Sequence, residues 1–422
     1  MDSRKLPILL LMTFNFFTVF LYASMPFIQN SNNRLPCLLF ILINLLCLYK
    51  GYNKGININL RKNYSYQPLG EISSRTLGYY FAIYSSTFLI IYFYQLRVPF
   101  LDFGALISRI IVGLADKHAG YTIKGAHTLP WSLFFLVSIV DSVFIIIGSL
   151  SWKKLKKYQK SLFVVFCIFE ILFWFGKGTN FGLIILISTI TFSVIANNQT
   201  ITLSNKSIRN YAFLALFAFT LALLVFNINM TSRSGGDLAN YDYNHITIPK
   251  GYINDNFIFN FIPQEFKSLY LYVCSYLTQG YYHLEYIFDT PYDWTMFFGN
   301  NPALAYLGEI FGINAEIISY QTKMEAIGID PYIHWHSCYL WLANDFSIFG
   351  VPFVMYFLGK MMGVSYIIYQ KNKDLLSGVI FIILSNMSLM LFANNNYISS
   401  VLYSLMFIHP YWYFSRYKKV KL

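Results

Sequence analysis

Apolar residues occur along the chain in long blocks that short polar segments separate. A helix needs about 20 apolar residues to cross a hydrocarbon core about 30 Å thick, and in lipid it satisfies its own backbone hydrogen bonds. The pattern therefore predicts an all-α fold, a polytopic bundle of about ten or more transmembrane helices with a large, partly helical outer loop. We place the spans at residues 6–28, 35–49, 73–95, 129–150, 161–176, 180–196, 210–228, 346–369, 375–392 and 397–414.

The first apolar block follows a short basic segment, as in a signal peptide. The block is longer than the apolar region of a signal peptide, and no small-residue cleavage site follows it. We therefore interpret residues 6–28 as a first membrane helix that the mature chain keeps.

Charge indicates how the spans are oriented. Of all residues, 56% are hydrophobic and only 12% are charged, while the formal net charge is +12. Basic residues gather in alternate loops and in the C-terminal tail, whereas the loops between them are nearly free of charge. The positive-inside rule then places the basic loops and both termini in the cytoplasm. The positive charge is explained by topology, so we expect no nucleic-acid partner. The basic loops are 49–62, 152–160, 205–209 and 370–374, and the nearly uncharged loops are 29–33, 176–180 and 393–396.

This orientation predicts three parts of the chain. Residues 1–228 form N-terminal membrane helices with an outer loop at 96–128, residues 229–345 form a large outer loop, and residues 346–422 form C-terminal helices and a basic tail. Within the large loop, residues 266–288 have the apolar spacing of an amphipathic helix, which Gly280 would interrupt. Such a helix suits the membrane interface, either as one wall of a lipid-substrate groove or packed on the bundle.

Several well-known motifs are absent from the sequence. There is no P-loop, no H-E-x-x-H, no dinucleotide fingerprint, and no Asp-x-Asp pair to hold the metal of a nucleotide sugar. The five cysteines lack zinc-site spacing, although Cys274 and Cys338 could form a disulfide on the outer face. We therefore expect no cofactor and no metal. The spans carry few charged residues, which is unlike a proton-coupled transporter.

Isolated basic residues in the outer segments are candidates for binding an anion. Arg233 lies beside Gly235 and Gly236, which would let the backbone approach a phosphate closely. Lys177, in a glycine-flanked outer turn, and Lys323, in the large loop, are further candidates. The alternative for Arg233 is a snorkelling side chain that marks the end of a span.

Three stretches of the outer loop and the next span resemble a known family. They are "SYLTQGYYHLEYIFD" (275–289), "FFGNNPALAYLGEIFG" (297–312) and "WHSCYLWLANDFSIFGVPFVMYFLGK" (335–360). Together with the topology they are similar to the Wzy-type O-antigen polymerases, which join oligosaccharide repeat units. The shared patterns are Tyr-Leu-Thr-x-Gly-Tyr-Tyr at 276–282 and Trp-His-x-x-Tyr-x-Trp-x-Ala-x-Asp at 335–345. His283 and Glu285 stand where related chains often have a small residue and a serine, a difference that could tune sugar specificity.

The resemblance implies a glycosyltransferase of the bacterial inner membrane, with its active site facing the periplasm. The donor would be a glycan on undecaprenyl diphosphate, and the acceptor a hydroxyl of a single lipid-linked repeat unit. The departing diphosphate would need cations, for which Arg233, Lys177 and Lys323 are candidates. The implied partners are these lipid-linked oligosaccharides, membrane lipid and a co-polymerase that sets chain length.

Aromatic and polar residues of the same motifs are candidates for holding the glycan. Sugars present flat apolar faces on which aromatic rings stack, although the same rings could simply form the aromatic belt of a membrane protein. The candidates are Tyr281, Tyr282, His283, Glu285, Trp335, Tyr339 and Trp341.

We rank His336 as the first candidate for the general base, because a neutral imidazole accepts a proton near neutral pH. Asp345 and Glu309 are the next candidates. The alternative for His336 is a ring that orients a neighbour. In one unbroken helix, His336 and Asp345 would lie on opposite faces. They converge only if the helix begins after His336, and Ser337 could cap such a start. We therefore predict that this helix begins near residue 338, with Trp341 and Asp345 on one face. His334 receives no role.

Other functions remain open. An O-antigen ligase would use similar donors and a similar base and arginine. A polysaccharide flippase or other transporter would place its cations in a central cavity and show internal repeats, and a lipid-linked-sugar glucosyltransferase would bring an acidic pair in the first outer loop.

Overall fold

The structure is a computed structural model, and it describes residues in each of the three predicted parts of the chain. The described residues are 3–27, 32–58, 65–66, 73–96, 98–99, 101–115, 143–176, 181–198, 226–227, 230, 256–300, 305, 308–329, 336–393 and 417–418. Most of the predicted spans at 129–150 and 210–228, and all of that at 397–414, lie outside them.

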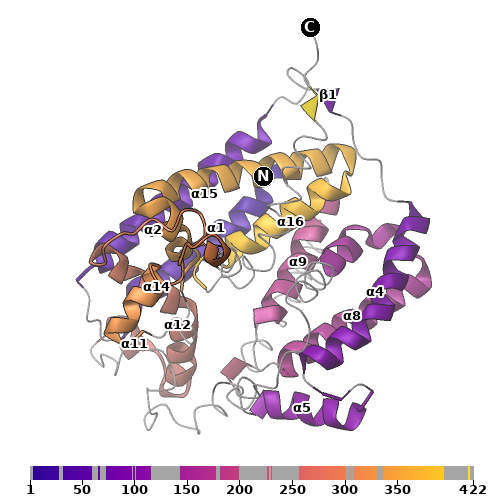
Figure 1. The fold of residues 1–422 in the computed structure, drawn as a ribbon, viewed down its shortest axis with the longest axis horizontal. Coiled ribbons are helices and arrows are strands. Elements are labelled where there is room, and N and C mark those ends of the chain that lie inside the picture. Colours follow the sequence, from indigo (N-terminus) through magenta and orange to yellow (C-terminus); the bar gives the residue numbers. More distant parts are fainter. Residues whose placement is uncertain are drawn as a thin grey trace. The chain divides into compact units, whose positions relative to one another are not determined.

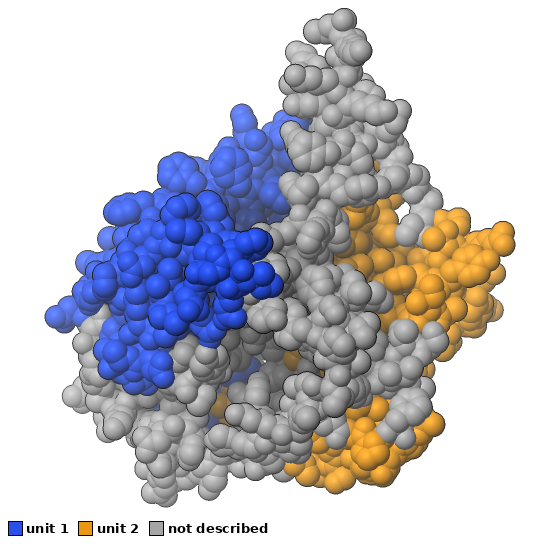
Figure 2. All heavy atoms as spheres, in the orientation of Figure 1, with its two compact units in different colours: residues 1–67, 242–368, 383–422 blue, residues 68–241, 369–382 orange. Residues whose placement is uncertain are grey.

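Most of the described residues are helical, which confirms the all-α class. The strands among them are one antiparallel pair of two residues each, β1 (Ser65–Tyr66) and β2 (Tyr417–Lys418). The chain divides into two compact units (Figure 2). Unit 1 comprises residues 1–67, 242–368 and 383–422, and unit 2 comprises residues 68–241 and 369–382. This grouping follows packing, whereas the three predicted parts follow topology.

Unit 1 contains the first two helices and most of the C-terminal half of the chain (Figure 1). Its helices are η1 (Ser3–Lys5), α1 (Leu6–Ser24), α2 (Arg34–Ile56), α11 (Phe257–Phe261), α12 (Gln264–Leu284), η4 (Glu285–Phe288), α14 (Tyr320–Lys323), η5 (Met324–Ile327), most of α15 (Cys338–Asn372) and the end of α16 (Leu375–Leu389). Three of the described helices, α1, α2 and α15, are long and apolar enough to cross a membrane. Those helices support the coarse prediction of a membrane protein.

Helix α2 is longer than the predicted span 35–49 because it continues through a glycine-rich segment that packs on α15. Gly51 and Gly55 on α2 meet Gly359 and Gly363 on α15, so each helix presents a G-x-x-x-G pair. A Cβ on Gly51 would lie 2.0 Å from the carbonyl oxygen of Tyr356. Small residues spaced by four let two helices in lipid approach to backbone contact. The two helices run in the same direction at this crossing, since successive turns of one meet successive turns of the other.

Helix α12 corresponds to the predicted amphipathic helix, with two differences. It runs through Gly280 without interruption, because this glycine allows backbone contact: a Cβ there would lie 2.1 Å from the Phe392 carbonyl oxygen. The side that the sequence predicts to be polar is also enclosed, since Ser275 and Thr278 are buried. The hydroxyl of Thr278 faces the sulfur of Met25 at 3.4 Å. Contacts from α1 and from residues 337 and 392 thus make α12 a core helix at its C-terminal half.

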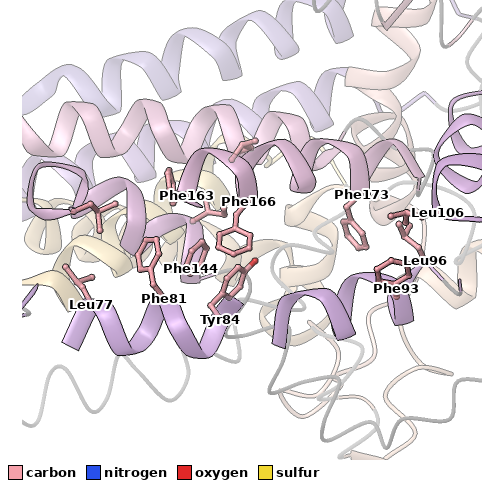
Figure 3. Packing of buried hydrophobic residues seen from close by; sticks show 13 residues of the cluster. Leu77, Phe81, Tyr84, Phe93, Leu96, Leu106, Phe144, Phe163, Phe166 and Phe173 are labelled. Carbon is pink, nitrogen blue, oxygen red and sulfur yellow. The ribbon is translucent and has the colours of Figure 1, made fainter. Parts of the chain in front are cut away.

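Unit 2 is built around aromatic rings from α4 (Ser74–Gln95), α5 (Phe103–Ala115), α8 (Lys157–Gly176) and a helical segment at 143–150. It also contains η2 (Trp152–Lys154), α9 (Phe181–Asn197) and residues 369–382 of α15 and α16. In Figure 3, Phe81 and Tyr84 of α4 point toward Phe144 and Phe166, and the Tyr84 and Phe144 rings stack 3.6 Å apart. The predicted outer loop 96–128 therefore contains a helix, α5, whose Leu106 joins this core.

Candidate active site

The first turns of α15 are the centre of the candidate site. The helix begins at Cys338, and the Ser337 hydroxyl accepts a hydrogen bond from the backbone N–H of Leu340 at 3.3 Å. This geometry is that of an N-cap, which satisfies a backbone donor that has no partner within the helix. The predicted start near residue 338 and the capping role of Ser337 are therefore confirmed.

A Ser337→Ala variant tests this cap. We expect the free energy of unfolding to fall by about 1 kcal/mol, because the N–H of Leu340 loses its side-chain acceptor in a buried site. Reversible unfolding in mixed micelles measures the change. Ser24→Ala is the matched control, since that hydroxyl donates within α1 to the carbonyl oxygens of Phe20 and Leu21 and caps no helix start. Equal stability of Ser337→Ala and the control would contradict the capping role.

Asn344 joins the start of α15 to two segments of the predicted outer loop. Its amide nitrogen donates to the carbonyl oxygen of Gly299 at 2.8 Å and to Gln321 Oε1 at 2.9 Å, and its Oδ1 accepts from the N–H of Tyr320 at 3.0 Å. Its carbonyl oxygen accepts from the Thr295 hydroxyl at 2.9 Å. Asn344 is fully buried, so these bonds replace those it would make to water. Asn344 therefore fixes the 295–299 and 320–321 segments beside Asp345.

Asp345 is bound through one of its two carboxylate oxygens. Oδ1 accepts hydrogen bonds from the Thr295 hydroxyl and from the N–H of Gly299, the latter at 3.1 Å. Oδ2 is buried and has no hydrogen-bond partner among the described residues. A buried carboxylate oxygen without a donor is costly to fold around. Such an atom is therefore a candidate for contact with a substrate hydroxyl.

Two tyrosines of this network are affected by their surroundings. The Tyr292 hydroxyl donates to the carbonyl oxygen of Asp345 at 3.2 Å, and its pKa is raised by burial and by the Asp345 charge. Burial and the neighbouring Tyr292 and Asp293 raise the pKa of Tyr320 to about 12. Both phenols therefore remain protonated at neutral pH, and that of Tyr292 acts as a hydrogen-bond donor.

His336 lies on the other side of the helix start. Its ring centroid is 5.2 Å from that of His283, and both side chains are buried. Among the described residues, Asp345 instead contacts Thr295, Gly299 and Tyr292. The helix begins after His336, as the predicted pairing with Asp345 requires, yet the two side chains do not form a hydrogen bond with each other. The reason is tertiary: α12 occupies the side of His336, and the 292–299 segment occupies the side of Asp345.

The predicted glycan-binding residues of α12 are mostly packed inside unit 1. Tyr281 is fully buried, with its hydroxyl 3.2 Å from that of Thr18 and its ring between those of Tyr22 and Tyr339. Burial raises the pKa of the Tyr281 phenol. Glu285, also buried, accepts a 2.5 Å hydrogen bond from the hydroxyl of Tyr22. These side chains join α12 to α1 and offer no open surface for a sugar to stack on.

The other candidates from the same motifs differ in exposure. Tyr282 is buried, and its hydroxyl is 3.2 Å from that of Tyr286. Trp341 is half-buried on the first turn of α15. Glu309 is exposed, and its carbonyl oxygen accepts a hydrogen bond from the N–H of Gly312, which closes a turn. Of these, Trp341 is the aromatic side chain that shares a helical face with Asp345.

Lys323 is the predicted phosphate-binding cation that the structure describes. Its ammonium group donates to Asp293 at 2.7 Å and to the carbonyl oxygen of Pro291 at 2.8 Å. The charge of Lys323 is thus balanced locally, and it ties α14 to the 291–293 segment. Arg233, Lys177, Trp335 and His334 lie outside the described residues.

Three residues received no predicted role from the sequence alone. Asn344 and Thr295 organise Asp345, and they become visible only through contacts between distant segments. Arg34 follows the uncharged outer loop 29–33 and donates to the carbonyl oxygens of Tyr22 and Ala23, at 2.6 and 2.9 Å. A lone arginine at an uncharged outer loop was a usable signal, the same one that drew attention to Arg233.

The disulfide that the sequence left open is not formed. Cys274 and Cys338 are both free and buried. Burial raises the pKa of the Cys274 thiol to about 12, so this thiol is unreactive at neutral pH. Within the described ranges, no group of three or more histidine, cysteine, aspartate or glutamate side chains could hold a metal ion.

Comparisons of the chain with protein-family models, with curated proteins and with solved structures found no match.

Proposed function

We propose that this chain is an inner-membrane glycosyltransferase that polymerises oligosaccharide repeat units linked to undecaprenyl diphosphate. The growing glycan moves from its lipid diphosphate to a sugar hydroxyl of a new repeat unit on the periplasmic side. The observation that carries this proposal is Asp345, a carboxylate with one oxygen fixed and the other buried without a hydrogen-bond partner among the described residues. It stands at the outer end of a candidate membrane helix, within the motif that resembles the polymerases.

The proposed reaction is a displacement at the anomeric carbon of the donor. The acceptor oxygen forms a bond to that carbon, the bond to the lipid diphosphate breaks, and the acceptor proton passes to Asp345 Oδ2. A base that holds the hydroxyl within hydrogen-bond reach contributes about 10²–10⁴-fold to such a step. Thr295 and Gly299 hold the other oxygen and so orient the carboxylate. Asp345 is therefore a better candidate for the base than His336, which is enclosed beside His283.

Cations must balance the charge of the departing diphosphate. Arg233 and Lys177 remain the candidates for this role, because the charge of Lys323 is already balanced by Asp293. Asp345 is buried in this structure, so the acceptor reaches Oδ2 only when side chains around that oxygen move, while Thr295 and Gly299 keep hold of Oδ1.

The helix directions support the proposed topology of about ten spans with both termini in the cytoplasm. Alternation of loops from a cytoplasmic N-terminus makes α2 and α15 both run from outside to inside. These two helices are parallel where their glycines meet, as that alternation requires. The start of α15 then faces the periplasm together with Asp345.

Deletion of the gene in its host tests the function. We expect lipopolysaccharide that carries core plus a single repeat unit, because export and ligation continue without polymerisation. Gel electrophoresis of lipopolysaccharide measures this, and a plasmid copy should restore the long ladder. Bare core with accumulated lipid-linked polymer would instead identify a ligase. An intact ladder would refute the proposed function, and with it the implied role of a co-polymerase as a partner of this chain.

A further inference from the structure

A tight turn at residues 295–298 presents apolar side chains at its tip. Met296 and Phe297 have φ values of 54° and 68°, and the N–H of Phe298 donates to the Thr295 carbonyl oxygen at 3.0 Å. Positive φ at both central residues is the geometry of a type I′ turn, which favours Asn and Gly. Bulky side chains are unfavourable there, so their presence at the tip requires an explanation.

Hydrogen bonds at both ends hold the turn in this strained form. Thr295 is bound to the carbonyl oxygen of Asn344, and Gly299 is bound through its N–H to Asp345 and through its carbonyl oxygen to Asn344. The Phe297 ring also packs on Phe346, with centroids 5.6 Å apart. The tip is therefore a fixed projection on the start of α15.

The tip is exposed although it is apolar. Trp294, Met296 and Phe297 are 50%, 49% and 52% exposed. Asp293, which precedes Trp294 in the chain, forms an ion pair with Lys323, and the Asp345 carboxylate beneath the turn is buried. Exposed apolar patches on loops mark surfaces that bind a partner or a membrane.

The turn lies next to a helix face that is suited to lipid. Phe349, Phe353 and Phe357 are spaced four apart on α15, a candidate membrane span, and they are 80%, 71% and 57% exposed. Phe346 contacts Phe297 and is separated from Phe349 by Ser347, whose φ of 55° and ψ of 174° interrupt the helix. The apolar surface of the turn therefore adjoins the residues of α15 that directly precede the exposed stripe.

We propose that the 294–297 turn inserts into the outer leaflet of the membrane, and that bilayer lipid is its partner. Trp294 lies at headgroup level, where indole rings are favoured, and Met296 and Phe297 reach the acyl chains. The insertion fixes the segment that covers Asp345 at the depth where a lipid-linked substrate would arrive. The proposal stands on the exposure and strain of the turn and does not depend on the proposed activity.

Site-directed spin labelling of the full chain tests the insertion. A nitroxide is placed at Met296→Cys, and separately at Trp294→Cys, in protein reconstituted into vesicles of phosphatidylethanolamine and phosphatidylglycerol. The five native cysteines are controlled by labelling the unmodified protein in parallel. Power saturation then compares collisions with oxygen, which partitions into lipid, and with a water-soluble nickel chelate.

We expect both labels to collide more with oxygen than with the nickel chelate, as a label at Phe353→Cys does on the lipid-facing stripe. Glu325→Cys, at an exposed charged position of η5, is the matched control that should show the reverse. Nickel-preferring labels at the turn would overturn the proposal. So would labels shielded from both reagents, which would show that protein covers the turn. If Met296→Cys does not fold, the label at Trp294→Cys alone tests whether the turn is inserted.

Discussion

An Asp345→Asn variant should lose polymerisation by about 10²–10⁴-fold while it folds nearly as well as the unmodified chain. The amide keeps an oxygen that accepts from Thr295 and Gly299, so the 292–299 segment stays attached. At the Oδ2 position it replaces an acceptor by a donor, which cannot take a proton from the sugar hydroxyl. The expected result in the deletion strain is lipopolysaccharide with a single repeat unit at normal protein level.

Two further variants separate chemistry from structure. Asp345→Leu removes both oxygens and leaves the Gly299 N–H buried without its acceptor, while the Thr295 hydroxyl keeps the carbonyl oxygen of Asn344. A buried unsatisfied donor costs about 1–3 kcal/mol, so this variant should be both inactive and unstable. Thr295→Val removes one donor to Oδ1 and leaves Oδ2 in place, so it should be destabilised but partly active. A normal ladder from Asp345→Asn would show that Oδ2 has no part in the reaction.

A Gly51→Ala variant should be destabilised by about 1–3 kcal/mol or more, although alanine is the better helix former. The new Cβ would lie 2.0 Å from the carbonyl oxygen of Tyr356 and 3.0 Å from the nitrogen of Lys360. Both atoms belong to the backbone of α15, so the clash is relieved only if the two helices separate. Thermal unfolding in lipid nanodiscs measures the effect, and Gly359→Ala should behave in the same way.

Gly78→Ala on α4 is the matched control for this prediction. The nearest atom to a Cβ there is the side-chain nitrogen of Gln159 at 3.7 Å, an ordinary contact. The same substitution should therefore stabilise α4 by about 0.5–1 kcal/mol, because alanine has less backbone freedom to lose on folding. Equal shifts in Gly51→Ala and Gly78→Ala would mean that the α2–α15 crossing does not depend on close backbone contact.

The sequence predicted the helices of this protein closely, because an apolar run long enough for a membrane is a local property. The predicted span 73–95 is α4 at Ser74–Gln95, and the predicted span 180–196 is α9 at Phe181–Asn197. The start of α15 was likewise predictable, since Ser337 needs only the next few backbone groups to cap a helix.

Two predictions were wrong because polar residues were assumed to mark the end of a helix or its solvent-exposed side. The predicted end of the second span at residue 49 is seven residues before the end of α2 at Ile56. Lys50 and Lys54 lower the hydropathy there, yet they are exposed on one side while Gly51 and Gly55 pack on α15. Ser275 and Thr278 were assigned to the polar side of α12 but are buried, because other segments of unit 1 enclose that side.

The sequence by itself thus determined the helical class and the start of α15, and it predicted the orientation of the charged loops and the stretch of chain in which a site would lie. Only the tertiary structure decided which residues of that stretch act together. Asp345 is organised by Thr295 and Gly299, almost 50 residues earlier in the chain, while His336 is separated from it by the packing of α12. Local sequence specifies helices because their hydrogen bonds are local, whereas a site depends on contacts between segments that no local pattern encodes.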